Sequence, residues 1–151
     1  MNKKPFDENK IYLIQSDTTP GFVSKNYKAI NAIKGRNKHT KCLITTNSFM
    51  ALKNLARAPK AHKILIRKAK KTSFIYKNNL CIRVSQNTEY NAFLANFSGA
   101  FAYSSSANFH GHSFNEAWAK MAADEVIGNK FCFLPSSHIY RLGKNRIIKL
   151  R

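Results

Sequence analysis

The stretch IYLIQSDTTPG, residues 11–21, joins a short apolar run to a loop of small hydroxyl-bearing and turn-forming residues. An apolar run as short as Ile11–Gln15 is typical of a buried β-strand. Ser16–Gly21 then supplies the serine, threonine, proline and glycine that end a strand and turn the chain. Because ligands of open α/β sheets gather where strands end, this stretch predicts a strand followed by part of a binding site.

Helices and strands alternate early in the rest of the chain, and strands dominate late. The predicted helices run from a Ser24 cap to Lys34, from an Asn47 or Ser48 cap through Leu55, from Tyr90 through Phe97 to a Gly99 cap, and from a Ser113 cap through Met121. The further predicted strands are residues 42–46, 72–76, 80–85, 101–103, 125–127, 131–134, 138–142 and 146–150. This order predicts an α/β fold, with a twisted mixed parallel and antiparallel sheet flanked by helices. We expect one domain over residues 1–151, with residues 1–10 a loosely ordered N-terminal segment.

Two connecting segments carry more specific expectations. Pro59 can begin a short helix with Ile64 and Leu65 facing inward, but the run Ile64-Leu65-Ile66 could equally be a strand, because periodicity does not separate the two. Asn78 and Asn79 suit a tight hairpin, because asparagine tolerates the positive φ that such a turn requires.

The composition favours a folded, strongly basic protein. The 151 residues include 26 Lys and Arg against 7 Asp and Glu, which gives a net charge of +19, and 44% of the residues are hydrophobic. That apolar content argues against disorder. We expect no membrane span, because no apolar run approaches about 20 residues, and no secretory signal, because the start is polar. The charge predicts a polyanionic partner, with nucleic acid ahead of acidic lipid, or else a merely solvated cationic surface.

The cysteines and histidines give no strong sign of a metal centre, and the tryptophan is expected to be structural. Cys42, Cys81 and Cys132 lie too far apart in the sequence for a zinc site or redox pair. We expect them to be buried, reduced thiols, which suits a cytoplasmic protein. His110 and His112 form only a weak candidate metal pair, because zinc normally takes three or four protein ligands. Trp118 lies on the apolar face of a predicted helix and is expected in the core.

Three loops that follow predicted strands are rich in small hydrogen-bond donors. They are Ser16–Gly21, Ser104–Gly111 and Pro135–Ser137. Hydroxyls, amides and free backbone N–H groups at such positions can hold phosphate or carboxylate oxygens. The basic segment Lys34-Gly35-Arg36 could supply matching cations, because arginine forks onto phosphate and lysine acts as a point charge.

The order of these segments resembles the YrdC-like family, the L-threonylcarbamoyladenylate synthases. The segments that carry the resemblance are Gln15-Ser16-Asp17-Thr18-Thr19-Pro20-Gly21-Phe22, Lys34-Gly35-Arg36, Cys81-Ile82-Arg83-Val84-Ser85, Ser105-Ser106-Ala107-Asn108 with Gly111, Pro135-Ser136-Ser137, and Lys149-Leu150-Arg151. They occur in the family's order over residues 11–151. The chain therefore resembles a short variant of that family.

The resemblance implies a nucleotidyltransferase that joins L-threonine, bicarbonate and ATP into threonylcarbamoyl-adenylate for tRNA modification. It implies Mg²⁺ on the ATP phosphates, with no metal ligand from the protein, and partner proteins of tRNA threonylcarbamoylation. By the resemblance, the catalytic residues, which also bind the nucleotide, are Lys34, Arg36, Ser106 and Asn108. The implied threonine-binding residues are Ser16 and Thr18, and the further implied nucleotide-binding residues are Arg83, Ser136 and Arg151.

Departures from the family pattern leave a second interpretation open. Pro20 replaces the family's tyrosine before glycine, Asn37 replaces the proline after its arginine, and the hairpin around Asn78 is short. The alternative is a non-catalytic module on the same fold that binds tRNA or double-stranded RNA through a basic face. A third possibility is a basic ribonuclease that uses His110 or His112. Asp17 is expected either to serve the site or to order its own loop as an Asx-turn acceptor.

Overall fold

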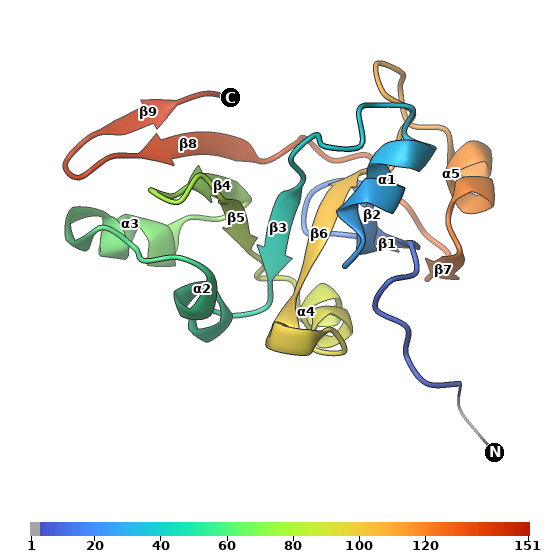
Figure 1. The fold of residues 1–151 in the computed structure, drawn as a ribbon, viewed down its shortest axis with the longest axis horizontal. Helices are drawn as coiled ribbons and strands as arrows, with labels where there is room; N and C mark the ends of the chain where they lie inside the picture. The colour runs from blue at the N-terminus through green and yellow to red at the C-terminus, as the bar shows by residue number, and fades with distance from the viewer. Residues whose placement is uncertain (1–3) are drawn as a thin grey trace.

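The computed structural model describes residues 4–151, which form one mixed sheet with helices packed against it (Figure 1). The strand order in the described residues is β7-β1-β2-β6-β3-β5-β4-β8-β9. The strands are β1 (Tyr12–Gln15), β2 (Pro20–Ser24), β3 (Leu43–Thr46), β4 (Thr72–Ile75), β5 (Cys81–Val84), β6 (Phe101–Ser106), β7 (Glu125–Ile127), β8 (His138–Leu142) and β9 (Ile147–Lys149). The pairs β1–β7, β3–β5 and β4–β8 are parallel and the others antiparallel, which confirms the predicted mixed sheet.

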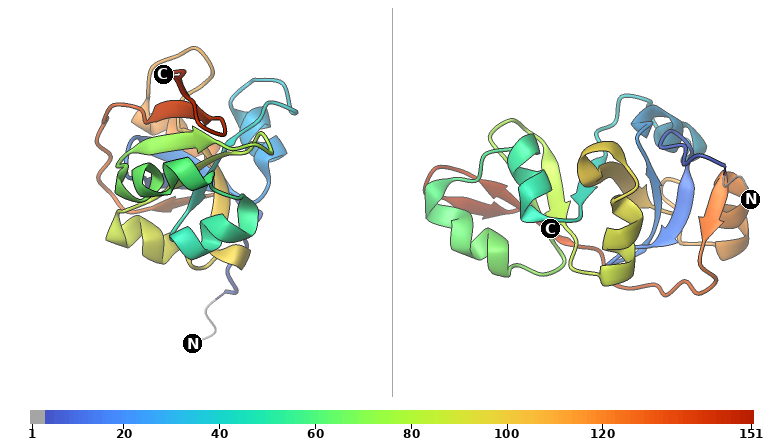
Figure 2. Two further views of the ribbon diagram at one scale, coloured as in Figure 1. Left: turned by 90° about the vertical axis from the view of Figure 1, so that its left-hand side faces the viewer. Right: turned by 90° about the horizontal axis from the view of Figure 1, so that it is seen from below.

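The helices cover the two ends of the sheet differently. They are α1 (Tyr27–Ile33), α2 (Phe49–Leu55), α3 (Lys63–Lys68), α4 (Thr88–Leu94) and α5 (Glu116–Ala122), with 3₁₀ turns η1 (Lys60–His62) and η2 (Ser98–Ala100). Figure 2 shows α2, α3 and α4 on one side of the sheet. Around β1 and β2, α4 packs on one face while α1 and α5 contribute to the core on the other. Around β4 and β5, α2 and α3 cover one face only.

Strand alternation decides which residues the uncovered face presents. Phe74 of β4 and Ile82 of β5 are paired across the strands and pack into the core with α2 and α3. Successive side chains of a strand point to opposite faces, so Ser73, Cys81 and Arg83 lie on the other side of the sheet. The sequence of these two strands therefore places polar groups on the face that has no helix.

One of the three predicted N-caps is confirmed, and the other two lie two residues further along the chain. Ser48 caps α2, as predicted, and accepts a hydrogen bond from the N–H of Ala51 at 3.1 Å. Asn26, not Ser24, caps α1, and Asn115, not Ser113, caps α5. Asparagine and serine are equally favourable N-cap residues, so the sequence alone does not show which of two nearby candidates begins the helix. Ser24 instead ends β2, where its hydroxyl donates to the carbonyl of Asn9.

The β4–β5 hairpin matches the prediction, and the helix α3 matches it in part. Asn79 has φ +64° in the β4–β5 turn, as expected for a tight hairpin. Residues 63–68 form the helix α3, but the inward residue is Ile66, while Ile64 and Leu65 are 68% and 43% exposed. The prediction that Ile64 and Leu65 face the core was therefore wrong, because the helix presents Ile66 to α2 and the sheet.

Four further predictions differ from the structure. The helix α4 ends at Leu94 with Ala95 as its C-cap, and Gly99 lies beyond it in η2 with φ +69°. Residues 131–134 form no strand, while β6 continues through Ser106, three residues further than predicted. The apolar residues at 131–134 suggested a buried strand, but they lie in the connection between β7 and β8, where Phe133 is 74% exposed. Cys132 in that connection is exposed and Cys81 only half-buried, so of the three free cysteines only Cys42 is buried as predicted.

The N-terminal residues that the structure describes contact the body of the protein. The ring of Phe6 stacks on Tyr12 with 5.1 Å between centroids. Glu8 accepts hydrogen bonds from the N–H and hydroxyl of Ser98 at 3.0 and 2.8 Å. Residues 4–10 are therefore held against the rest of the protein, in contrast to the loosely ordered segment predicted for residues 1–10. Residues 1–3 lie outside the described residues. Among residues 4–151, none of the helices has the length and apolar character required to cross a membrane.

Candidate functional site

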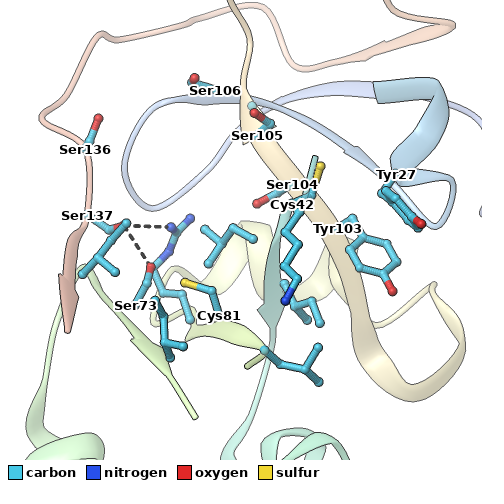
Figure 3. Close-up of a pocket in the computed structure, with 18 of the residues that line it drawn as sticks. Tyr27, Cys42, Ser73, Cys81, Tyr103, Ser104, Ser105, Ser106, Ser136 and Ser137 are labelled. Atoms are coloured by element: carbon cyan, nitrogen blue, oxygen red, sulfur yellow. Dashed lines mark hydrogen bonds between the residues drawn. The ribbon is translucent and has the colours of Figure 1, made fainter. Parts of the chain in front are cut away.

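A cavity of about 680 Å³ opens on the face of the sheet that α2 and α3 leave uncovered (Figure 3). Its volume is in the range of small-molecule sites. Its cationic lining residues are Arg36, Lys41, Arg83, Arg141 and Arg151, and its serines and threonines are Ser16, Thr18, Thr19, Ser73, Ser104, Ser105, Ser106, Ser136 and Ser137. Among the described residues that line it, none is an aspartate or glutamate. The cavity therefore favours an anionic ligand that accepts many hydrogen bonds.

The loop between β1 and β2 forms one ordered wall of the cavity. The hydroxyl of Ser16 donates to the carbonyl of Thr19 at 2.6 Å and accepts from the N–H of Thr18 at 3.1 Å. The side-chain oxygens of Ser16 and Thr18 lie 3.2 Å apart. Both residues are buried and both line the cavity. The structure thus places the two residues implied to bind threonine beside each other.

Arg83 connects this loop to the segment that precedes β8. Its Nε and Nη2 groups each lie 3.1 Å from Oδ1 of Asp17, and Nη1 lies 3.4 Å from the hydroxyl of Ser137. The ion pair is buried, with side chains 4% and 8% exposed. Asp17 therefore acts as the partner of Arg83 rather than as an Asx-turn acceptor. Because Asp17 neutralises Arg83, this arginine is better suited to holding the two loops together than to neutralising a ligand.

Ser137 is the point at which several cavity residues meet. Its hydroxyl lies 2.9 Å from that of Ser73, and Arg151 donates from Nε to its carbonyl at 2.9 Å and from Nη2 to its hydroxyl at 3.3 Å. Ser136, the neighbouring residue, also lines the cavity (Figure 3). The implied nucleotide-binding residues Arg83, Ser136 and Arg151 are thus brought together.

Arg141 is a cavity residue that the sequence analysis missed. It lies on β8, and its Nη1 group donates to Oδ1 of Asn79 in the hairpin at 3.3 Å. Ile139 and Arg141 line the cavity, whereas Leu142 is buried in the core with α2 and α3. The signal that could have found Arg141 is this alternation along β8.

Arg36 follows the end of α1 and lines the cavity together with Ser105 and Cys42. Its Nε group donates to Oδ1 of Asn31 at 2.7 Å, and its Nη2 group to the hydroxyl of Ser105 at 3.2 Å and to the sulfur of Cys42 at 3.3 Å. Gly35 has φ +68°, which glycine adopts without strain and which turns the chain out of the helix. The Nη1 group has no hydrogen-bond partner among the described residues, which leaves it available to a ligand.

Lys34 lies behind the cavity instead of in it. Its side chain is 2% exposed, and its Nζ donates to the carbonyls of Ser106 and Asn108 at 2.5 and 2.6 Å. Burial, with the nearby charge of Arg36 adding to it, lowers the pKa of Lys34 to about 8. The ammonium group therefore fixes the turn that follows β6.

The side chain of Asn108 is also used within its own loop. Its Nδ2 group donates to the carbonyls of Phe109 and His112 at 3.0 and 2.8 Å. Neither Lys34 nor Asn108 lines the cavity, whereas Arg36 and Ser106 do. Of the four residues implied to be catalytic, two thus face the cavity and two organise the chain beside it.

The remaining candidates lie outside the cavity. His110 and His112 are not among its lining residues. Within residues 4–151 there is no group of three or more histidine, cysteine, aspartate or glutamate side chains placed to hold a metal ion. Trp118 packs edge-on against Phe22, with 5.8 Å between ring centroids, at the edge of the core that includes α1 and α5, as predicted.

Comparison with known proteins supports the fold. No protein-family model and no curated sequence matches this chain. Among solved structures, E. coli YciO matches with a TM-score of 0.76 and 13% identity over 95% of this chain and 82% of that one. Sua5 of P. abyssi complexed with L-threonine matches with a TM-score of 0.73 and 16% identity over 94% of this chain and 50% of that one. MTH1692 of Methanobacterium thermoautotrophicum matches with a TM-score of 0.68 and 16% identity over 100% and 89%.

These likenesses confirm the predicted YrdC-like fold, because they extend over most of this chain. The chain spans about half the length of the Sua5 chain.

Proposed function

We propose that this chain is a nucleotidyltransferase that makes threonylcarbamoyl-adenylate from L-threonine, bicarbonate and ATP for tRNA modification. The observation that carries the proposal is the cavity itself, which is lined by five lysine and arginine side chains and many hydroxyls but by no carboxylate of the described residues. The same fold occurs in a Sua5 protein solved with L-threonine. The cavity suits a triphosphate beside a small amino acid.

The charges of the cavity are arranged to hold a polyphosphate. Arg83 is neutralised by Asp17, so the cations left for a ligand are Arg36, Lys41, Arg141 and Arg151. An arginine fork matches phosphate oxygens, and hydrogen bonds between charged partners are stronger than neutral ones. Hydroxyls such as those of Ser105 and Ser106 add neutral donors. The cavity therefore supplies the electrostatic stabilisation that phosphoryl chemistry requires.

The proposed reaction needs positioned substrates rather than a covalent intermediate. The threonine amine combines with bicarbonate to form a carbamate and water, and a carbamate oxygen then attacks the α-phosphorus of ATP and displaces pyrophosphate. Ser16 and Thr18 would hold threonine, while Arg36 and Ser106 would hold the carbamate against the α-phosphate. Lys34 and Asn108 would act through the turn that they fix. Holding the two reactants together supplies most of the required acceleration in reactions of this kind.

Mg²⁺ fits the cavity only as part of the ATP substrate. Protein sites for Mg²⁺ usually provide one or two carboxylates in addition to substrate phosphates. Asp17, whose neighbours Ser16 and Thr18 line the cavity, is already held by Arg83, and no carboxylate of the described residues lines the cavity itself. The ion would therefore be coordinated by phosphate oxygens and water.

The test is pyrophosphate release by the purified chain, measured with ATP, L-threonine and bicarbonate and with each omitted in turn. We expect release that requires all three, and a loss of at least tenfold in Arg36→Ala. Arg146→Ala is the matched control, because Arg146 is exposed and does not line the cavity. Absence of release from the chain alone and with the partner proteins of tRNA threonylcarbamoylation would contradict the proposal.

RNA binding is a second candidate function, favoured by the distribution of charge along the chain. Residues 18–88 contain 16 lysines and arginines and no aspartate or glutamate. They include α2 and α3, which lie together at one end of the molecule (Figure 1). Such a field attracts phosphate, and the affinity for tRNA or double-stranded RNA should then fall steeply with salt. Binding that does not change with salt would contradict this candidate.

A further inference from the structure

A second cavity, of about 440 Å³, lies beside the turn that Lys34 and Asn108 organise. It shares no lining residue with the larger cavity. Its lining residues are Phe109, His112, Ser113, Phe114, Asn115 and Trp118. Three of these are aromatic, a fourth carries an imidazole, and none of the described lining residues is charged like lysine or arginine. The lining suits a flat, aromatic group with polar edges.

The aromatic rings of this second cavity are held in place. Phe109 is 41% exposed and stands perpendicular to Trp118, with 6.0 Å between ring centroids. It meets His112 edge-on at 5.4 Å. The other side of Phe109 rests on Gly35, where a Cβ atom would come within 2.3 Å of the ring. Because Asn108 also bonds the loop carbonyls of Phe109 and His112, the open ring surface is preorganised.

A basic loop borders the second cavity. The N–H of His110 donates to the carbonyl of Lys34 at 3.0 Å, which joins the aromatic loop to the chain that leaves α1. Residues 34–41 contain no acidic residue, and although Arg36 and Lys41 line the larger cavity, Lys38 is exposed and lines neither cavity. The acid close by in sequence is Glu116 of α5, and it is paired with Lys120 at 2.9 Å. Aromatic surface and positive charge therefore lie side by side, but on different segments.

We propose that the second cavity receives an unstacked nucleobase of single-stranded RNA, while Lys38 of the basic loop of residues 34–41 binds a phosphate of an adjoining nucleotide. Stacking on aromatic side chains beside a basic track is how proteins bind single strands. A free nucleotide would gain stacking alone, because no lysine or arginine of the described residues lines this cavity. A strand would gain ion pairs as well. This inference rests on the RNA-binding candidate and is independent of threonylcarbamoyl-adenylate synthesis.

Trp118 makes the proposal directly measurable, because it is the single tryptophan of the chain. Its emission should be quenched when a single-stranded RNA of about ten nucleotides is added, since a base then stacks beside the indole. Duplex RNA of the same sequence should bind through charge and leave the emission unchanged. AMP at the same concentration should also leave it unchanged. Quenching by AMP as strong as that by the strand would overturn the assignment to a strand.

Phe109→Leu tests the cavity without uncovering Gly35, because leucine keeps an apolar group over it while removing the aromatic face. We expect the affinity for single-stranded RNA to fall about tenfold, in keeping with the loss of one stacked base, and the affinity for duplex RNA to stay the same. Phe133→Leu is the matched control, since Phe133 is 74% exposed and lines neither cavity. If Phe109→Leu does not fold, His112→Ala serves as a second variant, because His112 is exposed. His112→Ala should weaken the quenching of Trp118 by single-stranded RNA.

The outcomes separate the two levels of the proposal. Single-stranded RNA that binds without quenching Trp118, and equally well to Phe109→Leu, would overturn the second cavity as its site and leave RNA binding intact. Failure of both single-stranded and duplex RNA to bind at low salt would remove the RNA-binding candidate and the cavity assignment together. Neither result would bear on pyrophosphate release.

Discussion

The two ends of the sheet are built from the same alternation of side chains but differ in what covers them. At β1 both faces are packed, so Tyr12 and Leu13 are 2% and 0% exposed although they point in opposite directions. At β4 and β5 one face packs against α2 and α3, and the other faces the larger cavity. The filled end is apolar on both sides, whereas the open end is apolar on one side and on the other carries the polar side chains of Ser73 and Arg83 beside Ile75.

This difference shows how a small chain can hold a polar site without losing its core. Phe74 and Ile82 close the core at the open end, and their neighbours Ser73 and Arg83 turn to the cavity. Ser137 joins these two residues, because its hydroxyl is hydrogen-bonded to both Ser73 and Arg83, and Arg83 also donates to Asp17. The open end is therefore stabilised by a connected polar network in the place where the filled end has apolar side chains.

The largest effect is expected when that network loses its central cation. Arg83→Met leaves Asp17 buried without a partner, and breaking a buried ion pair in this way costs about 3–5 kcal/mol in the free energy of unfolding. Urea denaturation of the wild type and the variant measures this loss. If the open end were only a poorly packed region, methionine would be tolerated there.

The control for Arg83→Met restores the balance of charge. In the double variant Asp17→Asn with Arg83→Met the buried carboxylate is gone, so part of the lost stability should return. Arg146→Met, at an exposed position, should change the free energy of unfolding little. A loss in Arg83→Met no greater than that in Arg146→Met would show that the two ends do not differ in this respect.

A matched pair of truncations compares the two ends directly. Leu13→Ala at the filled end removes a fully buried side chain and should cost about 3 kcal/mol. Ile75→Ala at the open end removes a half-buried side chain that lines the larger cavity, and should cost only about 1 kcal/mol because less apolar area is lost. Thermal and urea unfolding of both variants measure the difference, and equal losses would contradict the comparison.

The strands and turns could be predicted because they depend on local pattern. The run at residues 11–15, the Ser48 cap and the Asn78-Asn79 hairpin depend on residues close in sequence, and the structure has all three. The wrong caps at Ser24 and Ser113 arose because neighbouring asparagines cap equally well. Exposure of Phe133 could not be predicted, since its surroundings come from distant segments.

The larger cavity was predictable in its members but not in their roles. The ordered segments include Arg36, Ser106 and Ser16, which all line the larger cavity. Lys34 lies behind the cavity because two carbonyls of the turn after β6 receive its ammonium group, and no pattern of residue letters shows where a long side chain turns. Arg141 was missed because it faces the cavity only once β8 is paired with β4.

Lys34 contacts the end of β6, the strand that lies between β2 and β3 in the sheet, and its removal tests that contact. Lys34→Met leaves the carbonyls of Ser106 and Asn108 without their donor and should cost about 2 kcal/mol. Pyrophosphate release should also fall, because the turn that carries Ser106 loosens. A variant as stable as the wild type would show that the turn does not depend on this contact.

The pH dependence of this contact has a definite sign. The pKa of Lys34 is lowered from its ordinary value of 10.5 to about 8, so between these values the unfolded chain binds a proton that the native chain does not. Stability therefore rises with pH in that range, and the cost of burying the charge is fully present below pH 8. The difference in unfolding free energy between the wild type and Lys34→Met should grow from pH 8 to 10. A difference that shrinks with pH would contradict the assignment.

The smallest effect is expected at Arg141, which tests whether the open end serves a ligand as well as the fold. Arg141 is exposed, and its hydrogen bond to Asn79 is a surface contact, so Arg141→Ala should leave the free energy of unfolding nearly unchanged. The affinity for ATP should fall about fivefold, or about 1 kcal/mol, because one of the unpaired cations of the larger cavity is lost. Calorimetric titration with ATP measures this, with Lys144→Ala as the control, since Lys144 is exposed and does not line the cavity. If both variants bind ATP as tightly as the wild type, Arg141 does not contribute to ATP binding, and the ligand site does not extend to this residue of β8.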